Sequence, residues 1–263
     1  MLSIFENNMQ KYLISLDKDN LRRELFFSQP DTADFQIFSA FNTMSESEEY
    51  LSKRFELTNF LQKYGRHATK GEVGCTLSHL GVYQQIIQDD SIGENEFSLI
   101  CEDDVLFHQD FPVVLQAILN QQSSADIILL GQSKIAKFND RELELNYPTA
   151  FLTDLKQTGF AIGYPYKNYY AGTVSYLIRK SAARIFLQTL EQEKPFWLAD
   201  DFILFGDEFG LNIQVVRPLV AIENPKLNSN LEALRGSNSH YFWQKLIKYP
   251  AKKLLAIKRN IRK

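Results

Sequence analysis

The amino-acid sequence predicts an α/β protein whose mainly parallel sheet is flanked by helices. Short apolar segments of strand length alternate along the chain with segments of helical period, which is the pattern of such sheets. The 263 residues are 44% hydrophobic and 23% charged, an ordinary globular composition. In addition, three consecutive acids follow one predicted strand, and sites in open α/β sheets lie beyond strand ends.

The first half of the chain alternates strands with helices of clear period. Polar residues that favour helix starts open two of the predicted helices. The predicted elements are a strand at 11–17, a helix at 19–29 capped by Asp19 or Asn20, a strand at 34–41, a helix at 45–65 opened by a Ser45–Glu48 capping box, and a helix at 70–90.

The second half continues the alternation around a less regular middle. Residues 132–172 are rich in Tyr, Gly and Asn and follow a less regular pattern, to which we assign no strand or helix. The predicted elements are a strand at 96–105, a helix at 111–121, a strand at 125–131, a strand at 173–180, a helix at 181–193 capped by Ser181, and a last strand at 212–218.

No internal repeat or low-complexity linker divides the chain, so we expect one domain over residues 1–239 and an appended tail at 240–263. The tail carries eight Lys or Arg and no acid, which leaves residues 1–239 with 21 basic and 32 acidic residues, a balance of −11. An acidic body disfavours nucleic-acid binding.

The basic tail has two readings. Cations mixed with aromatic and aliphatic residues suit an anionic membrane surface, at about 1 kcal/mol per cation. Alternatively, the tail is a helix that packs on the acidic body. We favour membrane attachment, although Pro250 is expected to interrupt the helix.

The N-terminal segment lacks the basic and long apolar regions of a secretory signal, and no apolar run approaches the ~20 residues of a membrane span. We therefore expect a cytoplasmic protein, peripheral on the inner face of the cytoplasmic membrane. Cys75 and Cys101 are each flanked by apolar residues, which predicts buried free thiols in a reducing compartment.

Glu102, Asp103 and Asp104 directly follow the apolar strand segment 97–101. Alternate side chains of an extended segment share a face, so Glu102 and Asp104 are predicted to converge while Asp103 points elsewhere. Two converging carboxylates suit a hard divalent ion such as Mn²⁺ or Mg²⁺. A solvated loop with helix-capping acids explains the same residues, and the pattern alone leaves both readings open.

Asp200 and Asp201 form a second acidic pair, between Trp197 and Phe202. Carboxylates at the start of a short helix are favourable as caps, which is the simpler reading. The functional reading makes one of them a general base among aromatic side chains that exclude water.

His79 lies in a predicted helix with Ser78 and Gly74, where it could donate a hydrogen bond to a phosphate or be a satisfied half-buried histidine. The other histidines show no partner spacing: His67, His108 and His240.

Four segments together resemble glycosyltransferase family 25, the bacterial lipooligosaccharide and lipopolysaccharide glycosyltransferases. They are KYLISLDKDNLRRELF, GEVGCTLSHLGVYQQII, ICEDDV and YAGTVSYLIRKSAARIFL, in that order. The second is the most specific, because its Gly-Cys-x-x-Ser-His run opens a helix just before the acidic strand end. The resemblance covers residues 11 to about 225, which leaves the tail outside it.

The resemblance implies an A-type (GT-A-like, Rossmann-type) glycosyltransferase fold, a nucleotide-sugar donor and inversion at the anomeric carbon. It implies that Glu102 and Asp104 bind Mn²⁺ (or Mg²⁺) and the donor diphosphate, which would supply the cation that the acidic strand end lacks. The other implied roles are Asp103 at the ribose or ordering its loop, a nucleotide pocket at Leu16 and Asp17 with Arg22 or Arg23, a donor wall of Gly74, Ser78 and His79, a segment beside the sugar at Gly172, Thr173 and Tyr176, and Asp200 as base with Asp201 second.

The sequence and the resemblance together predict an inverting transfer of a hexose from a UDP-sugar to a lipooligosaccharide core. We favour galactose and then glucose, and homo-oligomerisation stays open. Two alternatives remain: a metal-dependent phosphohydrolase that uses the same acids, and a non-catalytic member that binds nucleotide-sugars on the membrane.

Overall fold

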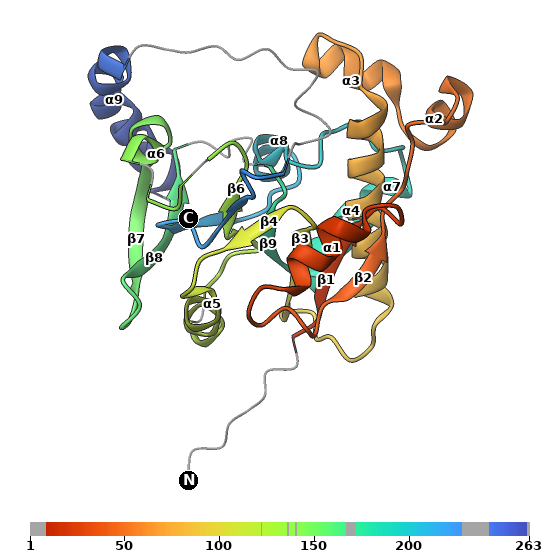
Figure 1. Ribbon diagram of the computed structural model, residues 1–263. Coiled ribbons are helices and arrows are strands. Elements are labelled where there is room, and N and C mark those ends of the chain that lie inside the picture. The colour runs from red at the N-terminus through yellow and green to blue at the C-terminus, as the bar shows by residue number, and fades with distance from the viewer. Residues whose placement is uncertain are drawn as a thin grey trace.

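A large mixed sheet organises the protein (Figure 1). The computed structural model describes residues 9–121, 123–135, 137–139, 141–166, 172–227 and 242–261. The order of the sheet is β2 (Gln36–Ser39), β1 (Lys11–Ser15), β3 (Phe97–Glu102), β9 (Ser175–Arg179), β5 (Ile127–Leu129), β10 (Ile213–Arg217), β8 (Phe160–Pro165) and β7 (Thr149–Leu155).

The α/β class is confirmed, but the prediction of a mainly parallel sheet is wrong. Among the described strands of this sheet, three neighbouring pairs are parallel and four are antiparallel. Strand β9 runs antiparallel between β3 and β5, and β8 runs antiparallel beside β10. Apolar strand patterns carry no information about strand direction, which is set by how the strands pair in the folded sheet.

A smaller sheet joins β4 (Val105–Phe107), β11 (Ala221–Glu223) and β6 (Gly131–Gln132). β11 follows β10, so the strand predicted at 212–218 is not the last one. The strand predicted at 125–131 is divided between β5 and β6, which belong to different sheets.

Helices cover both faces of the large sheet. On one face α4 (Lys70–Gln88), α7 (Lys180–Leu190) and α8 (Phe202–Asp207) pack against alternate strand residues such as Ile14 and Ile100. On the other face α1 (Asn20–Phe27) and α5 (Phe111–Asn120) pack against Leu13 and Leu99. This alternation within single strands is what a sheet buried on both faces requires.

The helix predicted at 45–65 is two helices, α2 (Glu48–Arg54) and α3 (Leu57–Tyr64). Phe55 between them is extended and buried beside Phe60, so the helix breaks where its ring enters the core. The cap of α2 is Ser47, which accepts from the Tyr50 N–H, and not Ser45.

Two other predicted caps also differ. Asp19 occupies the N-cap position of α1 without a side-chain hydrogen bond to the helix. α7 begins at Lys180, so Ser181 lies inside the helix instead of capping it. The helix predicted at 70–90 is confirmed as α4.

The middle segment, for which no regular structure was predicted, contains α6 (Arg141–Asn146) and the hairpin strands β7 and β8. The two strands pair with a register shift between Ala150 and Thr153. This irregularity breaks the strict alternation by which a strand is recognised.

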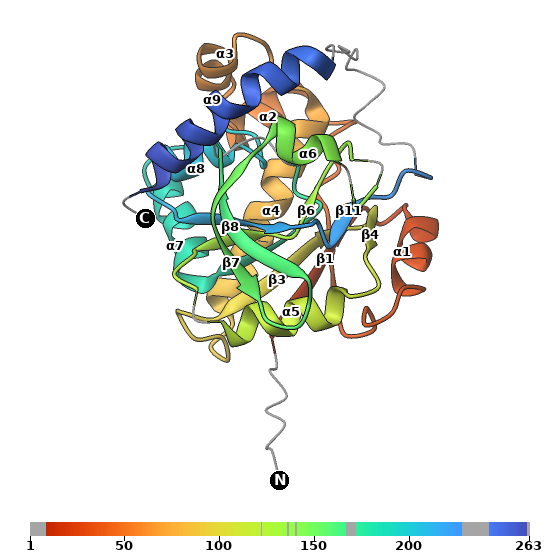
Figure 2. The same cartoon turned by 90° about the vertical axis from the view of Figure 1, so that its left-hand side faces the viewer.

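Helix α9 (Phe242–Asn260) packs along α6 and the β7–β8 hairpin (Figure 2). Lys253 Nζ lies 2.9 Å from Glu144 Oε1, and Lys252 Nζ donates to the Asn146 carbonyl at 3.0 Å. The helix continues through Pro250, contrary to prediction. The alternative that the tail is a helix packed on the body is therefore confirmed for the described part of the tail. His240 and the predicted boundary at residue 239 lie outside the described residues.

No helix in the described ranges is long and apolar enough to cross a membrane.

Candidate active site

A cavity of about 310 Å³ lies at the end of the sheet where β1 and β3 terminate. These two strands are parallel, and β9, which is antiparallel to β3, begins at the same edge. The first half of α4 forms another wall. Four segments distant in sequence therefore meet at this edge, and the cavity-lining residues used below are Leu16, Arg22, Gly74, Cys75, His79 and Glu102.

The acid cluster has a cationic partner within the chain. β3 ends at Glu102, and Asp103 and Asp104 lie in the turn that follows. Arg22 Nε lies 2.7 Å from Asp103 Oδ1, and Arg22 Nη2 lies 2.6 Å from Asp104 Oδ2. The expectation that only a metal supplies the missing cation is therefore wrong, because Arg22 supplies one. The prediction that Asp103 points away from Asp104 is also wrong, because both carboxylates bind Arg22.

The neighbouring Arg23 instead stabilises the end of β1 by hydrogen bonds. It donates to Ser15 Oγ at 3.1 Å and to the carbonyl of Asp17 at 2.9 Å. Ser15 Oγ donates to Asp103 Oδ2 at 2.6 Å, and Ser39 Oγ donates to Asp17 Oδ1 at 2.7 Å. Of the two arginines predicted for the nucleotide pocket, only the first is bound to the acids.

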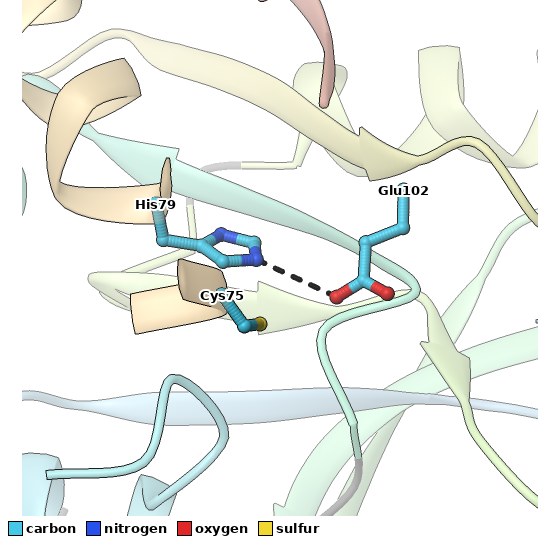
Figure 3. A group of neighbouring side chains, drawn as sticks. All are labelled: Cys75, His79 and Glu102. Carbon is cyan, nitrogen blue, oxygen red and sulfur yellow. Dashed lines mark ion pairs between the residues drawn. The ribbon is translucent and has the colours of Figure 1, made fainter. Parts of the chain in front are cut away.

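Glu102 points toward His79 and Cys75 of α4 (Figure 3). Its Oε1 lies 3.5 Å from His79 Nε2 and accepts a hydrogen bond from the Thr173 hydroxyl. Burial alone would raise the pKa of Glu102, but these two neighbours lower it. Burial, and then the charge of Glu102, raise the pKa of the Cys75 thiol well above its usual value.

Tyr176 of β9 holds the imidazole of His79. Its hydroxyl lies 2.7 Å from His79 Nδ1 and 2.9 Å from the hydroxyl of Tyr83. All three side chains are buried. His79 is thus fully enclosed on its Nδ1 side, and its Nε2 edge is the one directed at Glu102.

The residues present fit a hard divalent ion between Glu102 and Asp104. Asp104 Oδ1 is buried and has no hydrogen-bond partner among the described residues. Burial, and then the charge of Glu102, raise the pKa of Asp104 to about 8 even with Arg22 beside it. An oxygen-preferring cation would satisfy that atom and relieve the repulsion between the two carboxylates.

Gly74 and Ser78 fix the cavity wall by close packing. A Cβ on Gly74 would lie 2.5 Å from Thr43 Oγ1, so only glycine allows this approach. Ser78 Oγ donates to the Gly74 carbonyl at 2.7 Å and accepts from the Phe41 N–H at 2.9 Å. Both residues hold the segment around Phe41 against α4.

The acidic pair near α8 separates into two different environments. Asp201 is buried, accepts from the Leu204 N–H at 3.0 Å and from the Tyr64 hydroxyl at 2.5 Å, and caps α8. Asp200 is half-buried, and its Oδ2 accepts from the Gly172 N–H at 3.3 Å. The capping reading is confirmed for Asp201, whereas Asp200 lies close enough to Cys75 to help raise the pKa of its thiol.

Sequence reasoning treated Cys75 only as a buried structural thiol. Both cysteines are free, but Cys75 is half-buried and lines the cavity, while Cys101 is fully buried. The four-residue spacing between Cys75 and His79 on one helix face was the available signal. The remaining described histidines lie elsewhere: His67 is exposed, and His108 lies 3.5 Å from Asp110.

Comparison with curated proteins gives relatives whose names describe glycosyltransferases. "Probable inactive glycosyltransferase 25 family member 3" of Rattus norvegicus is 33% identical over 27% of this chain and 12% of its own length. "Procollagen galactosyltransferase 1" of Danio rerio is 34% identical over the same shares. "Putative glycosyltransferase R655" of Acanthamoeba polyphaga mimivirus is 27% identical over 68% of this chain and 52% of its own.

The chain thus spans about an eighth of the two animal relatives and about half of the viral one. The family model described as glycosyltransferase family 25 (LPS biosynthesis protein) matches residues 8–204. That match contains β1, α4, the acid cluster and β9, which are the segments that build the cavity. The chain belongs to glycosyltransferase family 25.

Proposed function

We propose that this glycosyltransferase is an inverting, metal-dependent enzyme with an A-type fold, which transfers a hexose from a UDP-sugar to a lipooligosaccharide core acceptor. Galactose is the favoured sugar and glucose the next. The observation that carries the proposal is the cavity at the common end of β1 and β3, where the carboxylates meet segments of the family match. A relative named as a galactosyltransferase supports the choice of galactose.

In this proposal Asp200 is the general base. It accepts the proton of the acceptor hydroxyl while that oxygen bonds to the anomeric carbon and the bond from this carbon to the UDP oxygen breaks. Asp201 is less suited, because one of its carboxylate oxygens caps α8 and the other accepts from the Tyr64 hydroxyl. The half-buried position of Asp200, near the cavity wall, supports the assignment.

Glu102 and Asp104 would hold Mn²⁺ or Mg²⁺, and the bound ion would stabilise negative charge on the departing diphosphate as a Lewis acid. Arg22 orients Asp103 and Asp104 from α1 and balances part of their charge. Asp103, held by Ser15 as well as Arg22, orders the turn and faces the cavity where a ribose would lie.

We also propose that the enzyme works at the inner face of the cytoplasmic membrane. Although α9 packs on the body, its outer side exposes Leu254, Leu255 and Ile257 among cationic residues. Exposed aliphatic and basic side chains on one helix suit an anionic lipid surface.

The direct test incubates the protein with Mn²⁺, a lipooligosaccharide acceptor and a panel of nucleotide sugars. We expect transfer from UDP-galactose or UDP-glucose, and loss of transfer in Asp104→Asn. No transfer or donor hydrolysis with any UDP-hexose, together with an Asp104→Asn variant that matches wild type, would overturn the proposal.

Two observations favour a non-catalytic alternative. Arg22 already pairs with two of the three acids, and one relative carries "probable inactive" in its name. Calorimetric UDP binding without turnover on any acceptor would support that alternative. Release of inorganic phosphate from simple esters would instead support a phosphohydrolase.

A further inference from the structure

Three side chains of different chemistry converge at the cavity wall (Figure 3). Cys75 and His79 are four residues apart on α4, so they share one face of the helix. Glu102 reaches them from the end of β3. Cys75 Sγ, one ring nitrogen of His79 and one oxygen of Glu102 all lie within 4.8 Å of one another.

The second observation concerns His79 itself. Its Nε2 is buried and lacks a hydrogen-bond partner among the described residues, at 3.5 Å from Glu102 Oε1. Its Nδ1 lies 2.7 Å from the Tyr176 hydroxyl, which can accept an Nδ1–H because a tyrosine hydroxyl both donates and accepts. A metal ion would select that tautomer, because Nε2 then presents its lone pair to the ion, and Tyr176 fixes the orientation of the ring.

We propose that Cys75, His79 and Glu102 form a binding site for a divalent ion of borderline softness, with Zn²⁺ as the ion that fits best. A thiolate, an imidazole and a carboxylate are a typical zinc ligand set, whereas Mn²⁺ and Mg²⁺ prefer oxygen alone. The Cys75 proton leaves to solvent when the thiolate binds. All three residues line the cavity, so a fourth ligand would reach the ion from there.

The geometry requires only small side-chain movements. Ligand atoms of a tetrahedral zinc ion lie about 3.3–3.8 Å apart, as follows from bond lengths of about 2.0–2.3 Å. The His79–Glu102 distance of 3.5 Å is already in that range. Because Glu102 also belongs to the proposed donor-metal pair, a zinc ion here would compete for that carboxylate, but the zinc site itself does not depend on the proposed function.

Titration of the chelator-treated full chain with Co²⁺ tests the site by its spectrum. We expect a thiolate-to-Co²⁺ charge-transfer band that saturates at an equimolar ratio and disappears when Zn²⁺ is added. Cys75→Ser should abolish the band. Tyr176→Phe should weaken Co²⁺ binding by about 10- to 100-fold, since it removes the partner that orients the ring.

Two matched controls separate this site from other metal binding. Cys101→Ser alters the other thiol, which is buried against Ser175, and should keep the band. Asp104→Asn removes a ligand of the proposed donor-metal pair and should also keep it. Circular dichroism establishes that each variant is folded.

A folded wild-type protein without the band, or a band that survives Cys75→Ser, would overturn the inference. Either result leaves transfer with Mn²⁺ untouched, so the failure of the zinc site and the failure of the proposed function are distinguishable.

Discussion

Glu72 shows how a single buried carboxylate anchors the helix that carries half of the site. It accepts hydrogen bonds from both terminal nitrogens of Arg66, at 2.7 and 2.8 Å, and one from the Thr69 N–H at 2.9 Å. Burial alone would raise its pKa, but the hydrogen bonds from Arg66 and Thr69 lower the pKa to about 2. The first turn of α4 is therefore tied to the segment before it.

This shift predicts a pH dependence of stability. The pKa of Glu72 is lower in the folded protein than its ordinary value of 4.5, so its stabilising contribution is present above pH 4.5 and is lost as the pH falls toward about 2. Glu72→Gln should therefore lower the melting temperature at neutral pH and reduce the acid sensitivity in this window. Melting temperatures measured between about pH 2 and pH 4.5 check this prediction. If the melting temperatures of variant and wild type fall in parallel with pH, Glu72 does not cause the acid sensitivity.

Replacing Asp200 or Asp201 by asparagine should affect different properties of the protein. Asp200→Asn is expected to lower kcat by about 10²–10⁴-fold with little change in melting temperature, as for removal of a general base. Asp201→Asn should mainly lower the melting temperature, because it weakens the cap of α8. Steady-state kinetics and thermal unfolding of both variants decide this, and equal kinetic losses would argue against Asp200 as the base.

The sequence alone predicted the acid cluster as a site, but it did not predict that Arg22 pairs with two of its carboxylates. Three carboxylates beside an apolar strand mark a strand end whatever the fold. The pairing of Arg22 with Asp103 and Asp104 depends on β1 lying parallel to β3, which no local pattern reports. Cys75 was missed as a site residue for a similar reason, because Glu102 reaches it from a different element.

Among the elements, the break between α2 and α3 is maintained by the core and not by local propensity. Phe55 is 1% exposed and lies in a cluster with Leu51, Phe60 and Val73. The period of residues 45–65 is helical throughout, so the sequence predicted one helix. Burial of the Phe55 ring outweighs the backbone hydrogen bonds that an uninterrupted helix would keep.

Phe55→Ala should destabilise the protein by about 3–5 kcal/mol, as is typical of a large aromatic removed from a core. Phe41→Ala is the matched control, because Phe41 is 43% exposed and should cost much less. Chemical denaturation of both variants measures the difference. Similar losses for the two would show that Phe55 is not what maintains the break.

At the scale of the whole molecule, α9 combines an inner side that packs on the body with an outer side that is basic and aliphatic. Lys253 and Asn260 contact the body, whereas Lys248 and Lys258 are exposed. The sequence presented packing and membrane attachment as alternatives. The structure shows the packing, and the side chains that we propose for membrane attachment are different ones on the same helix.

The double variant Lys248→Glu with Lys258→Glu should weaken binding to anionic vesicles by about 2 kcal/mol or more, roughly 30-fold, at about 1 kcal/mol per cation. Its melting temperature should not change. Lys253→Gln should behave in the opposite way, because it breaks the contact with Glu144. Vesicle flotation and thermal unfolding check both, and undiminished binding by the double variant would exclude a membrane role for these residues.

The fold class was predictable from sequence because strand and helix periods are local. The direction of β9 and β8 was not, since apolar residues alternate identically in parallel and antiparallel strands. β8 lies within the irregular middle of the chain, where a bulged hairpin hides the strand pattern, and β9 follows that segment. The direction of these strands could therefore be determined only from the structure.

The position of β10 in the sheet limits how far this chain can be shortened from its C-terminal side. The family match stops at residue 204, yet β10 (Ile213–Arg217) lies between β5 and β8 and pairs with both. A truncation at the family boundary would leave two unpaired strand edges where the centre of the sheet should be. We expect such a fragment to collect in inclusion bodies, and the shortest well-expressed version of this chain to extend past Glu223, the end of β11.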